Sequence, residues 1–128
     1  MKTLAGALMI VNAAFFFFGA AQHAGVAIGP FHEPRILPAA IVETICGAGL
    51  SWGALALFRD RKRSRTAALI ANFIALSGVL LGMAALAVGA GPRTSSNDLY
   101  HRLMLVLIVV VTLILMAPSR RRDIGSTQ

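Results

Sequence analysis

Four long apolar runs, separated by short polar connectors, account for most of the chain. They span residues 4–21, 38–58, 67–90 and 99–117, and each is close to the ~20 residues that a helix needs to cross a ~30 Å hydrocarbon core. Four helices and their connectors use all 128 residues. The pattern predicts an all-α integral membrane protein, a four-helix bundle in a single transmembrane domain.

The first run shares features with a secretory signal peptide, because Lys2 precedes it and small residues end it. However, residues 4–21 are longer than the roughly 7–15 residues of a typical signal core, and Asn12 interrupts the run. We expect the run to be a transmembrane helix, with cleavage as the alternative.

Positive charge alternates from one connector to the next. The basic loop 59–66, the basic tail 118–128 and Lys2 together hold nine Lys or Arg residues. The opposite side carries Arg35, Arg93 and Arg102. By the positive-inside rule, both termini are predicted to be cytoplasmic. A secondary role of the basic loop is contact with anionic lipid headgroups.

Composition narrows the class and the setting. A hydrophobic content of 57% and a mean hydropathy of +0.75 exceed those of an ordinary soluble domain. The net charge of +7 could suit nucleic acid, but its placement at membrane ends argues against that partner. The preference for Arg over Lys, with abundant Ala, Gly and Leu, suggests a GC-rich bacterial genome. We therefore expect a multi-pass protein of the bacterial inner membrane, with the lipid bilayer as its first partner.

Glu43 is the most conspicuous residue, because a carboxylate within an apolar run must be paired, protonated or next to water. The three histidines, His23, His32 and His101, fall on the same, non-cytoplasmic side. Tyr100 lies beside them, and Arg35 is a candidate partner of the carboxylate. We predict a functional cluster of these six residues, with a structural hydrogen bond of Glu43 as the alternative.

Imidazole can ligate haem or a metal ion, so a cofactor at the histidines is one hypothesis. Their spacing matches no metal signature, and the reading without a cofactor is preferred. The single cysteine, Cys46, excludes an internal disulfide and a Cys-x-x-Cys redox pair, and is expected to pack in the bundle. Tyr100 also suits ordinary anchoring at the membrane interface.

Small and amide residues predict how the helices pack. Pairs spaced by four residues, as in a G-x-x-x-G motif, let two helix backbones approach. These pairs are Gly49 with Gly53 and Gly78 with Gly82. In the first run, Asn12, Phe16, Gly19 and His23 share one helix face. We expect Asn72 in the third run to face Asn12, and Trp52 to pack in the bundle. The glycine contacts are expected within the chain, with a homo-oligomer as the alternative.

The connectors contain helix-end signals. Pro38 suits the first turn of the second helix. Ser95 with Asp98 three residues later predicts a capping box at the start of the fourth.

The segment Glu43-Thr-Ile-Cys-Gly-Ala-Gly-Leu-Ser-Trp-Gly53, followed by Arg65-Thr-Ala-Ala68, resembles the second span and following loop of DoxX-like membrane proteins. That family consists of small four-helix bacterial proteins, some associated with quinone-linked or thiol-linked oxidoreductases. The resemblance implies an accessory redox role. The first run lacks the family's glycine-and-lysine ending, so a distinct four-span family is the alternative.

The preferred function is a non-catalytic accessory or redox-associated membrane subunit, possessing a membrane protein partner or forming a homo-oligomer. No hydrolase, phosphate-loop or nucleophile-and-base motif is present in the sequence. A small proton-coupled transporter that uses Glu43 as its exchange carboxylate is one alternative. A haem- or metal-binding membrane protein is the other.

Overall fold

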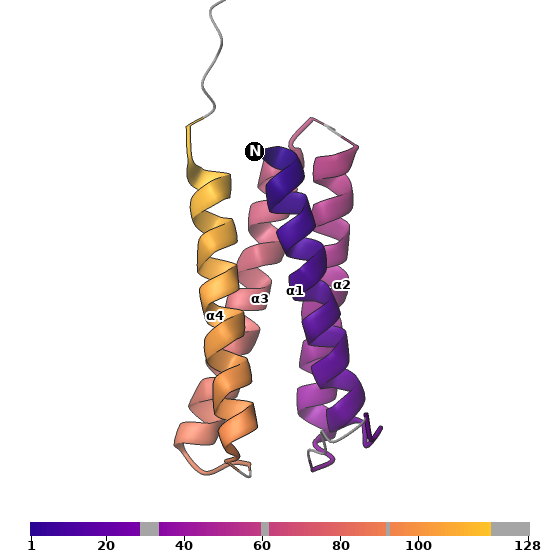
Figure 1. The fold of residues 1–128 in the computed structure, drawn as a ribbon, viewed down its shortest axis with the longest axis vertical. Coiled ribbons are helices and arrows are strands. Elements are labelled where there is room, and N and C mark those ends of the chain that lie inside the picture. Colours follow the sequence, from indigo (N-terminus) through magenta and orange to yellow (C-terminus); the bar gives the residue numbers. More distant parts are fainter. Residues whose placement is uncertain (29–33, 60–61, 92, 119–128) are drawn as a thin grey trace, which may run out of the picture.

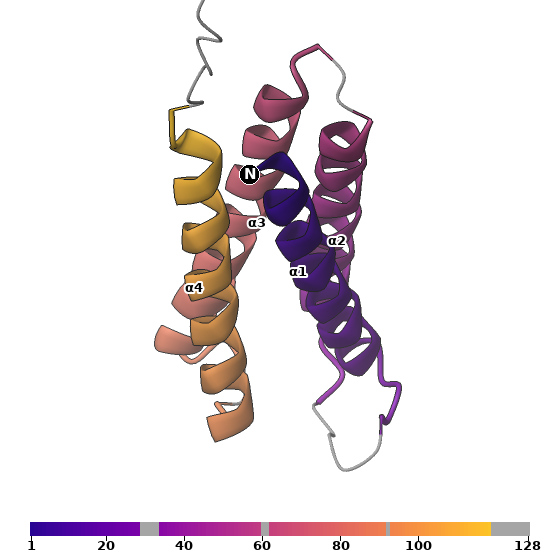
Figure 2. The same ribbon diagram turned by 45° about the horizontal axis from the view of Figure 1, so that its top comes forward.

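The computed structural model describes residues 1–28, 34–59, 62–91 and 93–118. Within these ranges lie four α-helices, α1 (Lys2–His23), α2 (Leu37–Phe58), α3 (Ser64–Ala87) and α4 (Ser95–Met116). The helices alternate in direction, so the start of α1, the α2–α3 connection and the end of α4 lie together at one end of the bundle (Figures 1 and 2). The predicted all-α four-helix fold is confirmed.

The two ends of the bundle differ in chemistry. We call the end with the N-terminus and the α2–α3 connection the basic end, after Lys2, Arg59, Lys62 and Arg63. The other end, which carries His23 and His101, is the histidine end. The basic connectors that alternate along the sequence therefore lie together at one end of the bundle.

The helices have the length and composition of membrane spans. They contain 22 to 24 residues, which corresponds to about 33–36 Å at 1.5 Å per residue. All four are apolar enough to cross a bilayer. Large apolar side chains face outward, with Ile41 61%, Leu81 60% and Leu113 63% exposed. Such a surface suits lipid rather than water, and the chain fits a multi-pass membrane protein.

The helix bounds differ from the apolar runs at α3 and α4. The third helix starts at Ser64 and ends at Ala87, whereas the apolar run covers 67–90. It ends early because Gly89 adopts a left-handed φ of +73°, and the Ala90 N–H donates to the Ala85 carbonyl, as in a Schellman motif. Polar residues form the first turns of both helices, so the basic loop is shorter than 59–66.

The N-cap of α4 is Thr94, and the predicted capping box at Ser95 is wrong. The Thr94 hydroxyl accepts from the Asn97 N–H at 3.0 Å. Asp98 instead pairs with Arg93, with 2.9 Å between Oδ2 and Nε. The N-cap lies one residue before the predicted one, because Thr94 and Ser95 are adjacent hydroxyl residues that both suit an N-cap.

Each helix packs against two others, α1 on α2, α2 on α3, α3 on α4 and α4 on α1. The core contains large apolar side chains from three helices, including Met9, Phe16, Leu50 and Ile108. The predicted position of Pro38 in the first turn of α2 is confirmed.

Glycines allow close approach at particular points. A Cβ at Gly53 would lie 2.9 Å from the Ala71 Cβ and 3.2 Å from the Ala68 Cα, so α2 and α3 nearly touch there. Gly78 lies against Cys46 across the same interface. Gly49 has no atom within 4 Å of its Cβ position, and packs against no neighbouring helix in the described chain.

Two of the packing predictions are wrong, namely the pairing of Asn12 with Asn72 and the position of Trp52 inside the bundle. Asn72 donates from Nδ2 to the Ile108 carbonyl at 2.9 Å and the Thr112 hydroxyl at 2.6 Å, so it joins α3 to α4. Both side-chain polar atoms of Asn12 are buried without a partner in the described residues. The expected pairing of the two amides is absent there. Trp52 is 58% exposed and lies on the outer surface rather than in the core.

Candidate functional site

Glu43 and His23 form a buried pair between α2 and α1. Glu43 lies on the core face of α2, which also carries Ala40, Cys46 and Leu50 at helical spacing. His23 is the last residue of α1. The imidazole Nδ1 and the carboxylate Oε2 are 2.8 Å apart, and both residues are at least nine-tenths buried. A carboxylate within an apolar helix needs a partner, and His23 is that partner for Glu43.

Gly19 makes room for the second carboxylate oxygen. A Cβ on Gly19 would lie 2.6 Å from the Glu43 Oε1 and 2.7 Å from the Tyr100 hydroxyl. Tyr100 donates to the Phe15 carbonyl at 3.2 Å and also contacts the Glu43 carboxylate. The carboxylate therefore sits among α1, α2 and α4, with Gly19 as the residue that permits this approach.

His101 brings a second imidazole to the site from α4. Its Nδ1 lies 2.9 Å from the Asn97 carbonyl. A carbonyl only accepts, so Nδ1 carries a proton and donates to it. Nε2 faces Gly82 on α3. The His101 ring packs edge-on against Tyr100, with centroids 5.5 Å apart.

These side chains border a cavity of about 290 Å³ at the histidine end. All four helices contribute to its wall, which is mostly apolar, with residues such as Phe16, Val42 and Ala85. Its polar lining residues are His23, Glu43, Asn97, Tyr100 and His101. A mostly apolar wall with a few polar groups is the usual form of a small-molecule site.

The structure brings together four of the six residues predicted as a cluster, namely His23, Glu43, Tyr100 and His101. Arg35 is exposed, and its aliphatic part lies over Gly25, where Cδ is 3.6 Å from the Cβ position. The Glu43 carboxylate is paired with His23 rather than with Arg35. His32 lies outside the described residues.

Sequence reasoning placed Gly19 on the correct helix face but gave it no role in the site. Its face, shared with Asn12, Phe16 and His23, is buried as predicted. The contact with Glu43 depends on the register of α1 against α2, which the sequence does not encode locally. Asn97, which holds His101, was missed because it reads as part of a polar connector.

The described His, Cys, Asp and Glu residues are the candidate metal ligands of the chain. Among those residues, no three His, Cys, Asp or Glu side chains gather closely enough to hold an ion. His23 and Glu43 supply two adjacent candidate metal ligands, the imidazole and the carboxylate.

Comparison of the chain with family models, curated proteins and solved structures gave no match. The resemblance to DoxX-like proteins stays a prediction.

Proposed function

We propose that this chain is a non-catalytic, redox-associated accessory subunit of a bacterial inner membrane, with both termini in the cytoplasm. The distribution of Lys and Arg between the two ends supports this orientation. In this role the subunit holds a lipid-soluble molecule with a polar ring, a class that includes quinones, in the cavity at the histidine end. The resemblance to DoxX-like proteins is in keeping with such a role.

The observation that carries the proposal is the Glu43–His23 pair at the polar side of an otherwise apolar cavity. A carbonyl or hydroxyl on a ring needs hydrogen-bond partners when it leaves water. Tyr100 and His101 lie beside the pair and supply a hydroxyl and an imidazole. At about 290 Å³ the cavity is near the lower limit of small-molecule sites, which suits one head group. The tail of the ligand would extend into the surrounding lipid.

The test is to identify what the protein carries from the membrane. The detergent-purified chain is examined by absorption spectroscopy, as isolated and after dithionite reduction, followed by solvent extraction and mass spectrometry. We expect a lipid-soluble ring compound at near-stoichiometric amount in the wild type, and much less in Glu43→Gln.

Arg35→Gln is the matched control, because Arg35 is exposed and does not line the cavity. It should retain the compound. Wild-type protein that yields only bulk lipid, and that binds no added short-chain benzoquinone in an equilibrium titration, would contradict the proposal.

A proton-coupled transporter is the second candidate, because Glu43 and His23 are two titratable groups in direct contact within a span. It predicts proton flux into sealed vesicles that is lost in Glu43→Gln. Haem or metal binding is the third candidate, and His23 and Glu43 would be its first ligands. The same spectra, with metal analysis, test it.

A further inference from the structure

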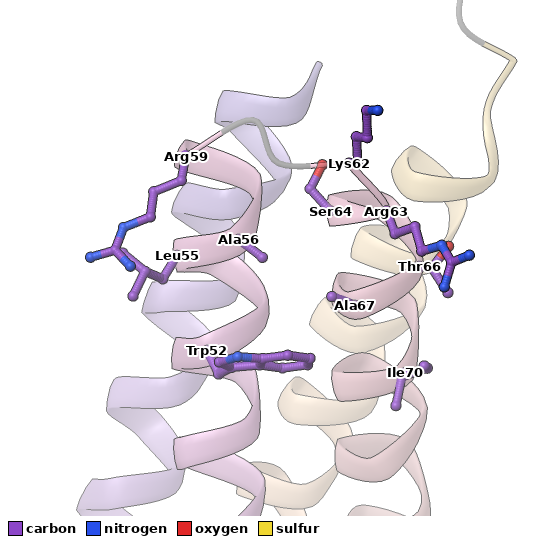
Figure 3. Close-up of a pocket in the computed structure, with 10 residues that line it drawn as sticks. All are labelled: Trp52, Leu55, Ala56, Arg59, Lys62, Arg63, Ser64, Thr66, Ala67 and Ile70. Atoms are coloured by element: carbon purple, nitrogen blue, oxygen red, sulfur yellow. The ribbon is translucent and has the colours of Figure 1, made fainter.

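A second cavity lies at the basic end, between the end of α2 and the start of α3. It measures about 400 Å³ (Figure 3). None of its described lining residues borders the cavity at the histidine end. Its apolar lining residues are Trp52, Leu55, Ala56, Ala67 and Ile70. Its polar lining residues are Arg59, Lys62, Arg63, Ser64 and Thr66. One cavity therefore has an apolar inner part and a positively charged opening, which we call its mouth.

The deep part of this cavity is open to the surrounding bilayer. Trp52 is 58% exposed, and Figure 3 shows its indole reaching from α2 toward α3. Ile70 on α3 is 52% exposed and lies at a similar depth. In a membrane-spanning bundle such outward apolar surface meets acyl chains. Trp52 lies seven residues before Arg59, which is about 10 Å along the helix. At that spacing, a lipid with its headgroup at Arg59 would place its acyl chain beside Trp52.

The mouth of the cavity is suited to an anion. Three basic residues line it, Arg59 at the end of α2 and Lys62 and Arg63 just before α3 (Figure 3). None of the described residues that line it is acidic. The three cationic side chains are long and exposed, so their charged groups can turn toward a ligand.

The start of α3 adds backbone donors at the same place. The first N–H groups of a helix lack intrahelical acceptors, and the N-cap residue Arg63 supplies no side-chain hydrogen bond to them. The first turn of α3 contains no acidic residue. Arg63 also has a φ of +65°, a left-handed conformation that residues with a side chain rarely adopt. An arginine therefore occupies a position that glycine would fill more easily.

We propose that this cavity binds one anionic phospholipid. Its phosphate lies among Arg59, Lys62 and the first turn of α3, and an acyl chain lies against Trp52 and Ile70. Charge complementarity at the mouth and the apolar depth beneath it together favour a lipid over a soluble anion. This site is independent of the ligand proposed for the histidine end.

Trp52 is the single tryptophan of the chain, so all tryptophan fluorescence comes from a residue that lines this cavity. The full chain is reconstituted in phosphatidylcholine vesicles that contain a fraction of lipid brominated on the acyl chains. Quenching by brominated phosphatidylglycerol is compared with quenching by brominated phosphatidylcholine. We expect the anionic lipid to be preferred at the tryptophan by about fivefold, the effect of roughly one surface charge.

Lys62→Gln should lower this preference by at least about twofold, because it removes one charge from the mouth. Arg65→Gln is the matched control. It removes a charge from the same end, but the Arg65 guanidinium donates to the Ala117 carbonyl at 3.0 Å and does not line the cavity. The control should keep the wild-type preference.

Equal quenching of the wild type by the two lipids would overturn the proposal, whatever the variants do. An equal loss of preference in Arg65→Gln and Lys62→Gln would also overturn it, because a general surface field would then explain the effect. Replacing chloride by phosphate at constant ionic strength should leave the preference unchanged. Loss of preference in phosphate would assign the mouth to soluble anions instead.

Discussion

Substituting Gly19 with alanine should disturb the candidate site from a residue that carries no functional group. The added Cβ would lie 2.6 Å from the Glu43 Oε1 and 2.7 Å from the Tyr100 hydroxyl, well inside the 3.4 Å at which ordinary contact begins. The carboxylate cannot retreat freely, because His23 holds its other oxygen at 2.8 Å. Movement of Tyr100 would break its bond to the Phe15 carbonyl.

The magnitude follows from two opposing effects. Overpacking a buried site costs about 1–3 kcal/mol. Replacing a helical glycine by alanine returns up to about 1 kcal/mol through helix propensity. Because both contacts lie under 3.0 Å, the overpacking cost should fall in the upper part of its range, and the net loss in unfolding free energy should be about 1–2 kcal/mol. The same substitution at Gly49, where no atom lies within 4 Å of the Cβ position, should be neutral or slightly stabilising.

The assay is reversible unfolding in mixed micelles with increasing SDS, followed by circular dichroism. Gly19→Ala/Tyr100→Phe should recover part of the loss, because the double variant removes one of the two crowded oxygens. Two results would show that Gly19 is not crowded by Glu43 and Tyr100. One is a Gly19→Ala protein as stable as wild type, and the other is a Gly49→Ala protein that is destabilised as much as Gly19→Ala.

Three further predictions use the same unfolding assay. Asn72→Ala should cost about 0.6–2 kcal/mol through loss of its bonds to α4, whereas Ser77→Ala, whose hydroxyl bonds within its own helix, should change little; equal effects would contradict this. Asn12→Leu should stabilise by about 1–3 kcal/mol, because it removes a buried amide without partners in the described chain, and destabilisation would show that the amide is satisfied. Thr94→Ala should cost about 0.5–2 kcal/mol, and Ser95→Ala much less; the reverse order would restore the capping box.

The sequence was sufficient to predict the four spans, because lipid exposure requires long apolar runs whatever the packing. It was also sufficient to predict that His23, Glu43, Tyr100 and His101 lie at one end of the bundle. In a bundle of antiparallel helices, every second connector lies at the same end. The sequence did not predict which group pairs with Glu43. That choice depends on the rotation of α1 against α2, which is set by contacts spread over the whole interface.

Helix rotation also explains the packing predictions that were wrong. Asn72 bonds to α4 rather than to Asn12, because the α3 face that carries it turns toward Ile108. Trp52 was expected inside and lies outside. In an apolar helix the inner and outer faces have nearly the same composition, so hydrophobic periodicity gives little information about orientation. In a soluble bundle, polar residues would have marked the outer face.

If the cavity at the histidine end holds a lipid-soluble molecule, a large side chain that fills the cavity should exclude that molecule. Ala85 lines the cavity, whereas its neighbour Ala84 is exposed and does not. Binding of a short-chain benzoquinone is measured by equilibrium titration of Ala85→Phe and Ala84→Phe. We expect an affinity loss of at least about tenfold, or 1.4 kcal/mol, for Ala85→Phe and little change for Ala84→Phe. Equal affinities in the two variants would contradict this expectation.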